Sequence, residues 1–273
     1  MLKKILDELS YQMQYNLRYI YYRIFQRDVS SNIGLSGSAS GDCFILFTGS
    51  SVNEFDLNLL KGKNIVATNH LYMHQHYPDL EVSDYVVLEN WSLKNVVFLG
   101  YMLDLIILRR KQTNKKMRLW LSHSFKAYLN TINYHHESYS SRLLSHVDIH
   151  HILNVGEITK TDEIKMDFSK AVNVGTGVKM ASIFLAKYLG YEKIYLIGND
   201  HSISPLNIGH FYELNNEVHN DFDKNNFTQK RLHAQNKMLV DCLNASGIEI
   251  YNIVPPGKNS IGLPAAKFED VVR

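Results

Sequence analysis

Four short polar stretches of this sequence carry side chains that could bind an anion or move a proton. The first follows the apolar run 43–47 and consists of Thr48, Gly49, Ser50 and Ser51. Its glycine would let a ligand approach the backbone closely, and its hydroxyls can donate to a phosphate. An ordinary turn at the end of a strand explains the same residues. The G-x-G-x-x-G dinucleotide fingerprint and the G-K-[ST] phosphate loop are both missing from the sequence, so the turn alone is a weak signal.

The second stretch is the loop of Gly175, Thr176 and Gly177, directly before a helical pattern at 178–189. Unpaired N–H groups and the positive end of the helix dipole coincide at a helix N-terminus, so we expect this loop to bind a phosphate or a carboxylate. The alternative is a tight loop whose glycines let the helix and the sheet approach each other.

The third stretch follows the apolar run 193–197 and comprises Asn199, Asp200, His201 and Ser202. Asp200 could hold a ribose hydroxyl, orient a histidine or cap the following segment. Such polar groups at the tip of a strong strand are where ligands bind in open parallel sheets.

The fourth stretch, residues 207–212, includes His210 and Tyr212 within an asparagine-rich, aperiodic region. A histidine beside a glycine in a polar lid is a candidate general base near pH 7. A lone histidine is more often an ordinary surface or core residue, and both interpretations stay open.

Short apolar runs that alternate with helical patterns would position these stretches. The runs expected as strands are 44–47, 64–68, 85–88, 96–99, 118–121, 193–197 and 249–253. This alternation predicts an α/β fold of Rossmann type, with a mostly parallel sheet and helices on both faces. The clearest unit is 173–198, in which a helix at 178–189 ends at Gly190.

The chain divides into an N-terminal amphipathic helix (1–29), a glycine- and serine-rich linker (30–42) and a catalytic domain (43–273) whose lid spans about residues 201–230. The expected helix 2–27 has one apolar face, and its other face is basic and rich in tyrosine. This helix would lie on anionic membrane lipid, or dock on its own domain or on a sister subunit of a homo-oligomer.

The composition excludes several classes of protein. With 29 basic and 27 acidic residues, the chain offers no broad footprint for nucleic acid. The two cysteines, Cys43 and Cys242, are far apart in apolar contexts, so a disulfide framework is not expected and a reducing cytoplasm fits best. No apolar stretch is long enough to span a membrane. We therefore expect a cytoplasmic protein, in peripheral contact with the inner face of the membrane if helix 2–27 binds lipid.

In the same places the sequence resembles the bacterial sialyltransferases of glycosyltransferase family 42 and related bacterial glycosyltransferase-like domains. The family's glycine turn N-G-P-S-L with its E-x-D pair is matched at 48–56, and its strand end C-N-Q-F-Y at 68–72. Further matches are the turn T-S-G-V at 175–178, the run A-L-G-Y-K-E-I-Y-L-x-G-x-D at 189–200, the lid motif I-G-H at 208–210 and the strand end C-P-N-S at 253–260. Each motif is loose, but order and spacing agree over about residues 43–260.

The resemblance implies a single nucleotide-binding domain, a GT-A-like variant of the Rossmann type, with a small lid. It implies an inverting, metal-independent glycosyltransferase of polysaccharide biosynthesis, without a cofactor, that moves a sialic-acid-like or Kdo-like sugar from its CMP conjugate to a glycan or glycolipid hydroxyl. By position, Gly49 and Ser51 would line the nucleotide phosphate, and Asn69 would contact the CMP part. Thr176 and Gly177 would hold the carboxylate of the donor sugar.

By the same resemblance, His210 would be the base that deprotonates the acceptor hydroxyl. The sequence departs from the family at Thr48, where the family has asparagine, and at His70, where it has glutamine. The two tyrosines that bind the leaving phosphate in the family have no clean equivalents, and Tyr212 or His201 are the available substitutes.

Two other functions stay open. One is a pterin-type diphosphokinase-like enzyme, which would need Mg²⁺ held by carboxylates such as Asp200. The other is a nucleotide-sugar-binding protein without turnover, which the missing tyrosines would explain.

Three weaker signals have plain structural explanations. His146, Asp148, His150 and His151 could hold a metal ion, or could form an exposed edge strand. The basic cluster of residues 109–111 and 115–116 would be a solvated face, or would attract an anionic acceptor glycan or membrane lipid. The D-x-D motif at 221–223 is best explained as a solvated loop.

Overall fold

The computed structural model describes residues 29–88, 96–110, 116–123, 147–154, 165–173, 177–204, 210–212 and 226–273. The predictions for the helix 2–27, for Gly175 and Thr176, and for the motif 221–223 lie outside these residues. None of the helices within the described ranges is long and apolar enough to cross a membrane.

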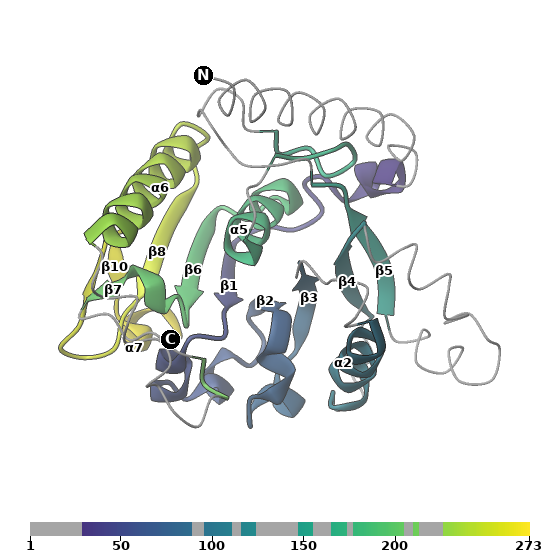
Figure 1. The fold of residues 1–273 in the computed structure, drawn as a ribbon, viewed down its shortest axis with the longest axis horizontal. Helices are drawn as coiled ribbons and strands as arrows, with labels where there is room; N and C mark the ends of the chain where they lie inside the picture. The colour runs from purple at the N-terminus through teal and green to yellow at the C-terminus, as the bar shows by residue number, and fades with distance from the viewer. Residues whose placement is uncertain are drawn as a thin grey trace, which may run out of the picture.

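One eight-stranded sheet organises the described chain, and every neighbouring pair of its strands is parallel. The predicted α/β class is therefore confirmed. In space the strands follow the order β10-β8-β6-β1-β2-β3-β4-β5 (Figure 1). Their bounds are β1 Asp42–Leu46, β2 Asn64–Thr68, β3 Val82–Val87, β4 Met117–Ser122, β5 Val147–Ile152, β6 Lys193–Ile197, β8 Glu249–Ile253 and β10 Ala265–Ala266.

The chain builds this sheet outward from its middle in two directions. From β1 it adds β2 to β5 on one side, and it then places β6, β8 and β10 on the other side. The order reverses between β1 and β6, which pair with Leu46 opposite Ile197. At such a switch point, open parallel sheets bind ligands outside the carboxyl ends of the two strands.

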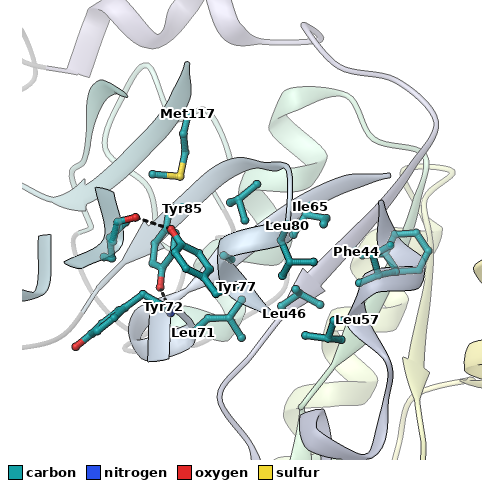
Figure 2. Packing of buried hydrophobic residues seen from close by; sticks show 14 of the residues in the cluster. Phe44, Leu46, Leu57, Ile65, Leu71, Tyr72, Tyr77, Leu80, Tyr85 and Met117 are labelled. Atoms are coloured by element: carbon teal, nitrogen blue, oxygen red, sulfur yellow. Dashed lines mark hydrogen bonds between the residues drawn. The ribbon is translucent and has the colours of Figure 1, made fainter. Parts of the chain in front are cut away.

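Helices cover both faces of the sheet, so the strands bury side chains on both sides. On one face, Cys43 and Ile45 of β1 pack with side chains of α5 and α6. On the other face, Phe44 and Leu46 pack with side chains of α2 and α7, and Figure 2 shows part of this cluster. The helices are α2 Val96–Leu108, α5 Val178–Leu189, α6 Asn226–Asn244 and α7 Phe268–Val271.

Short 3-10 helices follow the carboxyl ends of the central strands. η2 and η3 follow β1, η4 and η5 follow β2, and η8 follows β6. η8 continues into β7, which pairs antiparallel with β9. The bounds are η1 Ser30–Leu35, η2 Ser50–Glu54, η3 Leu57–Leu60, η4 Asn69–Met73, η5 Tyr77–Asp79, η8 Asp200–Ser202, β7 Ile203–Ser204 and β9 Asn259–Ser260.

Several sequence predictions are confirmed to the residue. β2, β6 and β8 have the predicted bounds, and α5 ends at Gly190, whose φ of 105° is left-handed. The predicted strand at 96–99 is wrong, because these residues begin α2. With Asp104 as its one charged residue, α2 has no polar stripe to give a helical period. The lid ends before residue 230, since α6 begins at Asn226.

Residues 30–42, predicted as a linker, lie against the C-terminal end of α5. The N–H of Gly37 donates to the carbonyl of Tyr188 at 3.0 Å. Gly190 can carry no side chain here, because a Cβ would come within 2.7 Å of the carbonyl oxygen of Ala39. These residues therefore pack against the domain.

The far edge of the sheet is β5, which contains three of the four residues considered as metal ligands. Its position confirms the edge-strand alternative. Asp148 accepts from Lys116 Nζ at 3.1 Å, and the ring of His150 stacks on Trp120 at 4.7 Å. Among the described residues, no group of three or more histidine, cysteine or carboxylate side chains is placed to hold a metal ion, and His146 lies outside them.

Candidate functional site

The first and third polar stretches meet at the switch point, and Asp200 joins them. Its Oδ2 atom accepts from Ser50 Oγ at 2.9 Å and from the Ser51 N–H at 3.0 Å, while its Oδ1 atom accepts from Ser51 Oγ. Asp200 is 4% exposed. The carboxylate therefore accepts from the first turn of η2, and the N-cap of its own helix η8 is Asn199, which makes no side-chain cap.

This contact changes the role expected for the serines. Gly49 and Ser51 were expected to line a phosphate, with the hydroxyls of the turn as donors. In the structure the Ser51 N–H and both serine hydroxyls donate to the carboxylate of Asp200. These three donors are therefore engaged within the protein.

Gly49 is required because the ends of β1 and β6 approach closely. A Cβ at Gly49 would lie 2.4 Å from the carbonyl oxygen of Gly198 and 2.5 Å from Cγ of Asp200. The Gly49 N–H donates to that same carbonyl at 3.1 Å. The glycine thus lets two parts of the protein approach each other.

The lid segment 210–212 is attached to the turn after β1. Gly49 and His210 form an isolated antiparallel bridge, and the N–H of Phe211 donates to the carbonyl of Thr48 at 3.1 Å. Phe211 packs on the hydrophobic cluster that contains Phe44. Residues 210–212 of the fourth polar stretch therefore reach the switch point, and backbone hydrogen bonding and apolar burial hold them there.

The ring of His210 faces Thr48. Nδ1 lies 3.0 Å from Thr48 Oγ1 and 3.3 Å from the Thr48 carbonyl oxygen. A carbonyl can only accept, so its contact favours the tautomer with the proton on Nδ1. In that tautomer Nε2 carries the lone pair that a general base needs.

Aromatic rings connect His210 to the end of β2. The rings of His210 and Tyr212 are nearly parallel, at 5.1 Å and 4°, and Tyr212 meets His70 edge-on at 5.3 Å. All three side chains are partly exposed. We call Thr48, His70, His210 and Tyr212 the His210 cluster; it brings together four predicted site residues from three parts of the chain.

Asn69, which directly precedes His70 in the chain, has an unusual backbone conformation. Its φ of 42° is the one positive value at a residue other than glycine among the described residues. The buried hydroxyl of Tyr85 donates to the Asn69 carbonyl at 2.7 Å and accepts from the Tyr72 N–H at 3.0 Å; Tyr72 and Tyr85 are labelled in Figure 2. Such backbone outliers cluster at functional sites, where the surrounding structure maintains them.

A buried histidine that the motifs did not indicate lies next to the lid. His74 is 1% exposed, and its ring meets Phe211 edge-on at 5.3 Å. Burial, with smaller effects of His76 and Arg109, lowers the pKa of His74 to about 4. Its Nδ1 accepts from the His76 N–H at 3.2 Å, so the neutral ring carries its proton on Nε2, which has no hydrogen-bond partner in the described part of the chain.

Arg109 belongs to the same neighbourhood. It was expected on a solvated basic face, but it is partly buried and donates to the carbonyl of Tyr72. Arg110 is also partly buried, and burial lowers its pKa. The first two residues of this basic cluster therefore lie partly buried on the domain, Arg109 near His74 and Arg110 near Tyr77.

The other predicted site residues either take no part in the His210 cluster or lie outside the described residues. Asn199 is buried and donates to Asn252 Oδ1 at 3.2 Å, and Ser202 is buried among side chains of α5 and α6. His201 is exposed on η8, and Gly177 is the exposed N-cap of α5.

No protein-family model matches this chain, and no curated protein matches it. The resemblance to glycosyltransferase family 42 therefore stays an expectation that depends on the motifs. What bears on function is the arrangement of Thr48, Gly49, His70, His210 and Tyr212 at the switch point of the sheet.

Proposed function

We propose that the chain is an inverting, metal-independent glycosyltransferase that moves a sialic-acid-like or Kdo-like sugar from its CMP conjugate to a glycan hydroxyl. The observation that carries this proposal is the bridge between Gly49 and His210. It holds an imidazole at the carboxyl end of β1, where the strand order reverses. The acceptor would be a glycan or glycolipid assembled at the inner face of the membrane.

The reaction requires one proton transfer and one departing phosphate. The acceptor oxygen bonds to the anomeric carbon while the bond from that carbon to the CMP oxygen breaks, and the electron pair leaves with CMP. Nε2 of His210 takes the hydroxyl proton, and the carbonyl of Thr48, which faces Nδ1, stabilises the imidazolium that forms. Attack opposite to the departing CMP inverts the anomeric configuration. Positioning supplies most of the remaining rate enhancement.

The departing phosphate needs hydrogen-bond donors. The serines of the first turn donate to Asp200, so we assign this contact to His70 and Tyr212. Both lie within the His210 cluster, and Tyr212 stacks directly on the proposed base. Tyr212 then takes the place of a leaving-group tyrosine of the family.

The two other functions differ in what they require. A diphosphokinase would use Asp200 to hold Mg²⁺, and this reading has less support because the carboxylate accepts hydrogen bonds from Ser50 and Ser51. A binding protein without turnover would bind CMP through the same residues and would release no product.

The deciding experiment uses the full chain with CMP-N-acetylneuraminic acid or CMP-Kdo and a glycan acceptor in EDTA, and it measures released CMP and glycosylated product. We expect release coupled to transfer. Turnover that requires ATP and Mg²⁺ would favour the kinase, and CMP binding without release would favour the binding protein. A chain that does not bind CMP and does not release it from the donor would overturn the proposal.

A further inference from the structure

A second polar cluster joins Lys179 of α5, Ser202 of η8 and Asn236 of α6, and we call it the Lys179 cluster. Lys179 Nζ donates to Ser202 Oγ at 3.0 Å and to Asn236 Oδ1 at 2.7 Å. The amide of Asn236 donates to Ser202 Oγ at 2.9 Å and to the carbonyl of Ile261 at 2.8 Å. Ser202 is 0% and Asn236 is 2% exposed, so these groups lie inside the protein.

With Lys179 protonated, the Lys179 cluster has more donors than acceptors. An ammonium has three N–H donors, and two of those of Lys179 are directed to Ser202 and Asn236. The oxygen of Ser202 accepts from both neighbours, so its own hydrogen points elsewhere. Among the described residues, neither the third N–H of Lys179 nor this hydroxyl hydrogen has an identified acceptor.

The positive charge is also uncompensated in the described part of the chain. Although Lys179 as a residue is only partly buried, burial of its ammonium lowers its pKa to about 7, and no neighbouring carboxylate contributes to that shift. The first turn of α5 contains no acidic residue, and its N-cap, Gly177, provides no side-chain cap. The positive end of the helix dipole and the lysine therefore coincide, an arrangement that favours a bound anion.

We propose that the Lys179 cluster is a binding site for the oxyanion of a small molecule, a carboxylate or a phosphate, held by Lys179 and Ser202. The anion supplies the negative charge and the acceptors that the cluster lacks. Asn236 contacts both groups and positions them. This site goes beyond the proposed transfer reaction, and it does not depend on CMP binding.

The test follows Lys179 by NMR in the full chain labelled with ¹³C at the lysine ε carbons. Inorganic phosphate and pyruvate are titrated separately against sodium chloride of equal ionic strength, and the pH titration of each lysine signal is repeated with and without the anion. We expect the Lys179 signal to shift saturably with at least one anion, and its pKa to rise, because a bound anion stabilises the ammonium. The anion that acts identifies the site as one for phosphate or for carboxylate.

Lys187 is the matched control, because it lies in the last turn of the same helix and donates to Ser246 Oγ. Its signal should change no more than sodium chloride changes it. Lys179→Met assigns the Lys179 signal and should abolish the anion response, and Lys179→Arg assigns it if the methionine variant does not fold. A Lys179 signal that responds to neither anion would overturn the proposal and leave this lysine as a structural link between α5, η8 and α6.

Discussion

The carboxylate of Asp200 accepts a hydrogen bond from the backbone N–H of Ser51 at 3.0 Å and thereby joins the ends of β6 and β1. Both serine hydroxyls donate to it as well, and it is almost fully buried. We expect Asp200→Asn to lower the free energy of unfolding by about 1–3 kcal/mol, because an amide nitrogen cannot accept these bonds. Urea denaturation followed by circular dichroism measures the change.

Asp167 is the matched control for Asp200. Its carboxylate also accepts from the N–H and the hydroxyl of one serine, Ser169, at 3.0 and 2.5 Å, but its side chain is 44% exposed. Asp167→Asn should therefore cost less than about 1 kcal/mol. Equal losses in the two variants would contradict the linking role of Asp200.

Gly49→Ala tests the close approach of the two strand ends. The new methyl group would overlap the carbonyl of Gly198 and the carboxylate of Asp200, so we expect a loss of about 1–3 kcal/mol in unfolding free energy and a loss of CMP binding. Gly34→Ala is the control, because its Cβ would meet nothing within 4 Å. Calorimetric melting and titration with CMP measure both effects, and an unchanged melting temperature for Gly49→Ala would contradict the packing argument.

The sheet could be predicted because strands covered on both faces read as short apolar runs. β1 buries Phe44 on one face and Ile45 on the other, and its run ends at the polar turn that Thr48 begins. The same rule failed at α2, since a helix that is apolar nearly all around gives the same pattern as a buried strand.

The site could be predicted only in outline. The rule that ligands bind at carboxyl ends placed Gly49 and Asp200 at one edge, and the lid motif added His210; contacts join the three there. Sequence could not reveal that Asp200 uses the donors of Ser51, since this contact spans 149 positions. Lys179 was also missed, because its burial depends on packing of η8 and α6 against α5 and no local motif signals it.

The buried ring of His74 should make the fold sensitive to acid. Its folded-state pKa of about 4 lies below the ordinary value of 6.5, so the unfolded chain takes up the proton first as the pH falls. Stability is therefore lost between about pH 6.5 and pH 4, by on the order of 3 kcal/mol. Urea denaturation across this range measures the slope. His74→Gln should flatten it, and exposed His201→Gln should not; an unchanged slope in His74→Gln would contradict this assignment.

Arg118→Met should destabilise the fold strongly. Arg118 donates to both carboxylate oxygens of Asp84, at 2.7 and 2.8 Å, and Asp84 is 0% exposed. Removing one partner of a buried ion pair leaves the other charge without compensation, so we expect a loss of about 3–5 kcal/mol. Lys116→Met, directly before β4, breaks an exposed pair with Asp148 and should cost at most about 1 kcal/mol. Chemical denaturation measures the loss of unfolding free energy in both variants. Equal losses would contradict the prediction.

His210→Ala tests the proposed base directly. Sugar transfer should fall by roughly 10²- to 10⁴-fold, the usual contribution of a general base. CMP affinity should stay nearly unchanged, because the imidazole faces Thr48 and is assigned to the acceptor hydroxyl and not to the nucleotide. His151→Ala on the distant edge strand β5 is the control and should retain full transfer. Steady-state kinetics of CMP release and calorimetric titration with CMP separate the two effects. A larger loss in His201→Ala than in His210→Ala would move the base to η8, and unchanged turnover in His210→Ala would remove this residue from the mechanism.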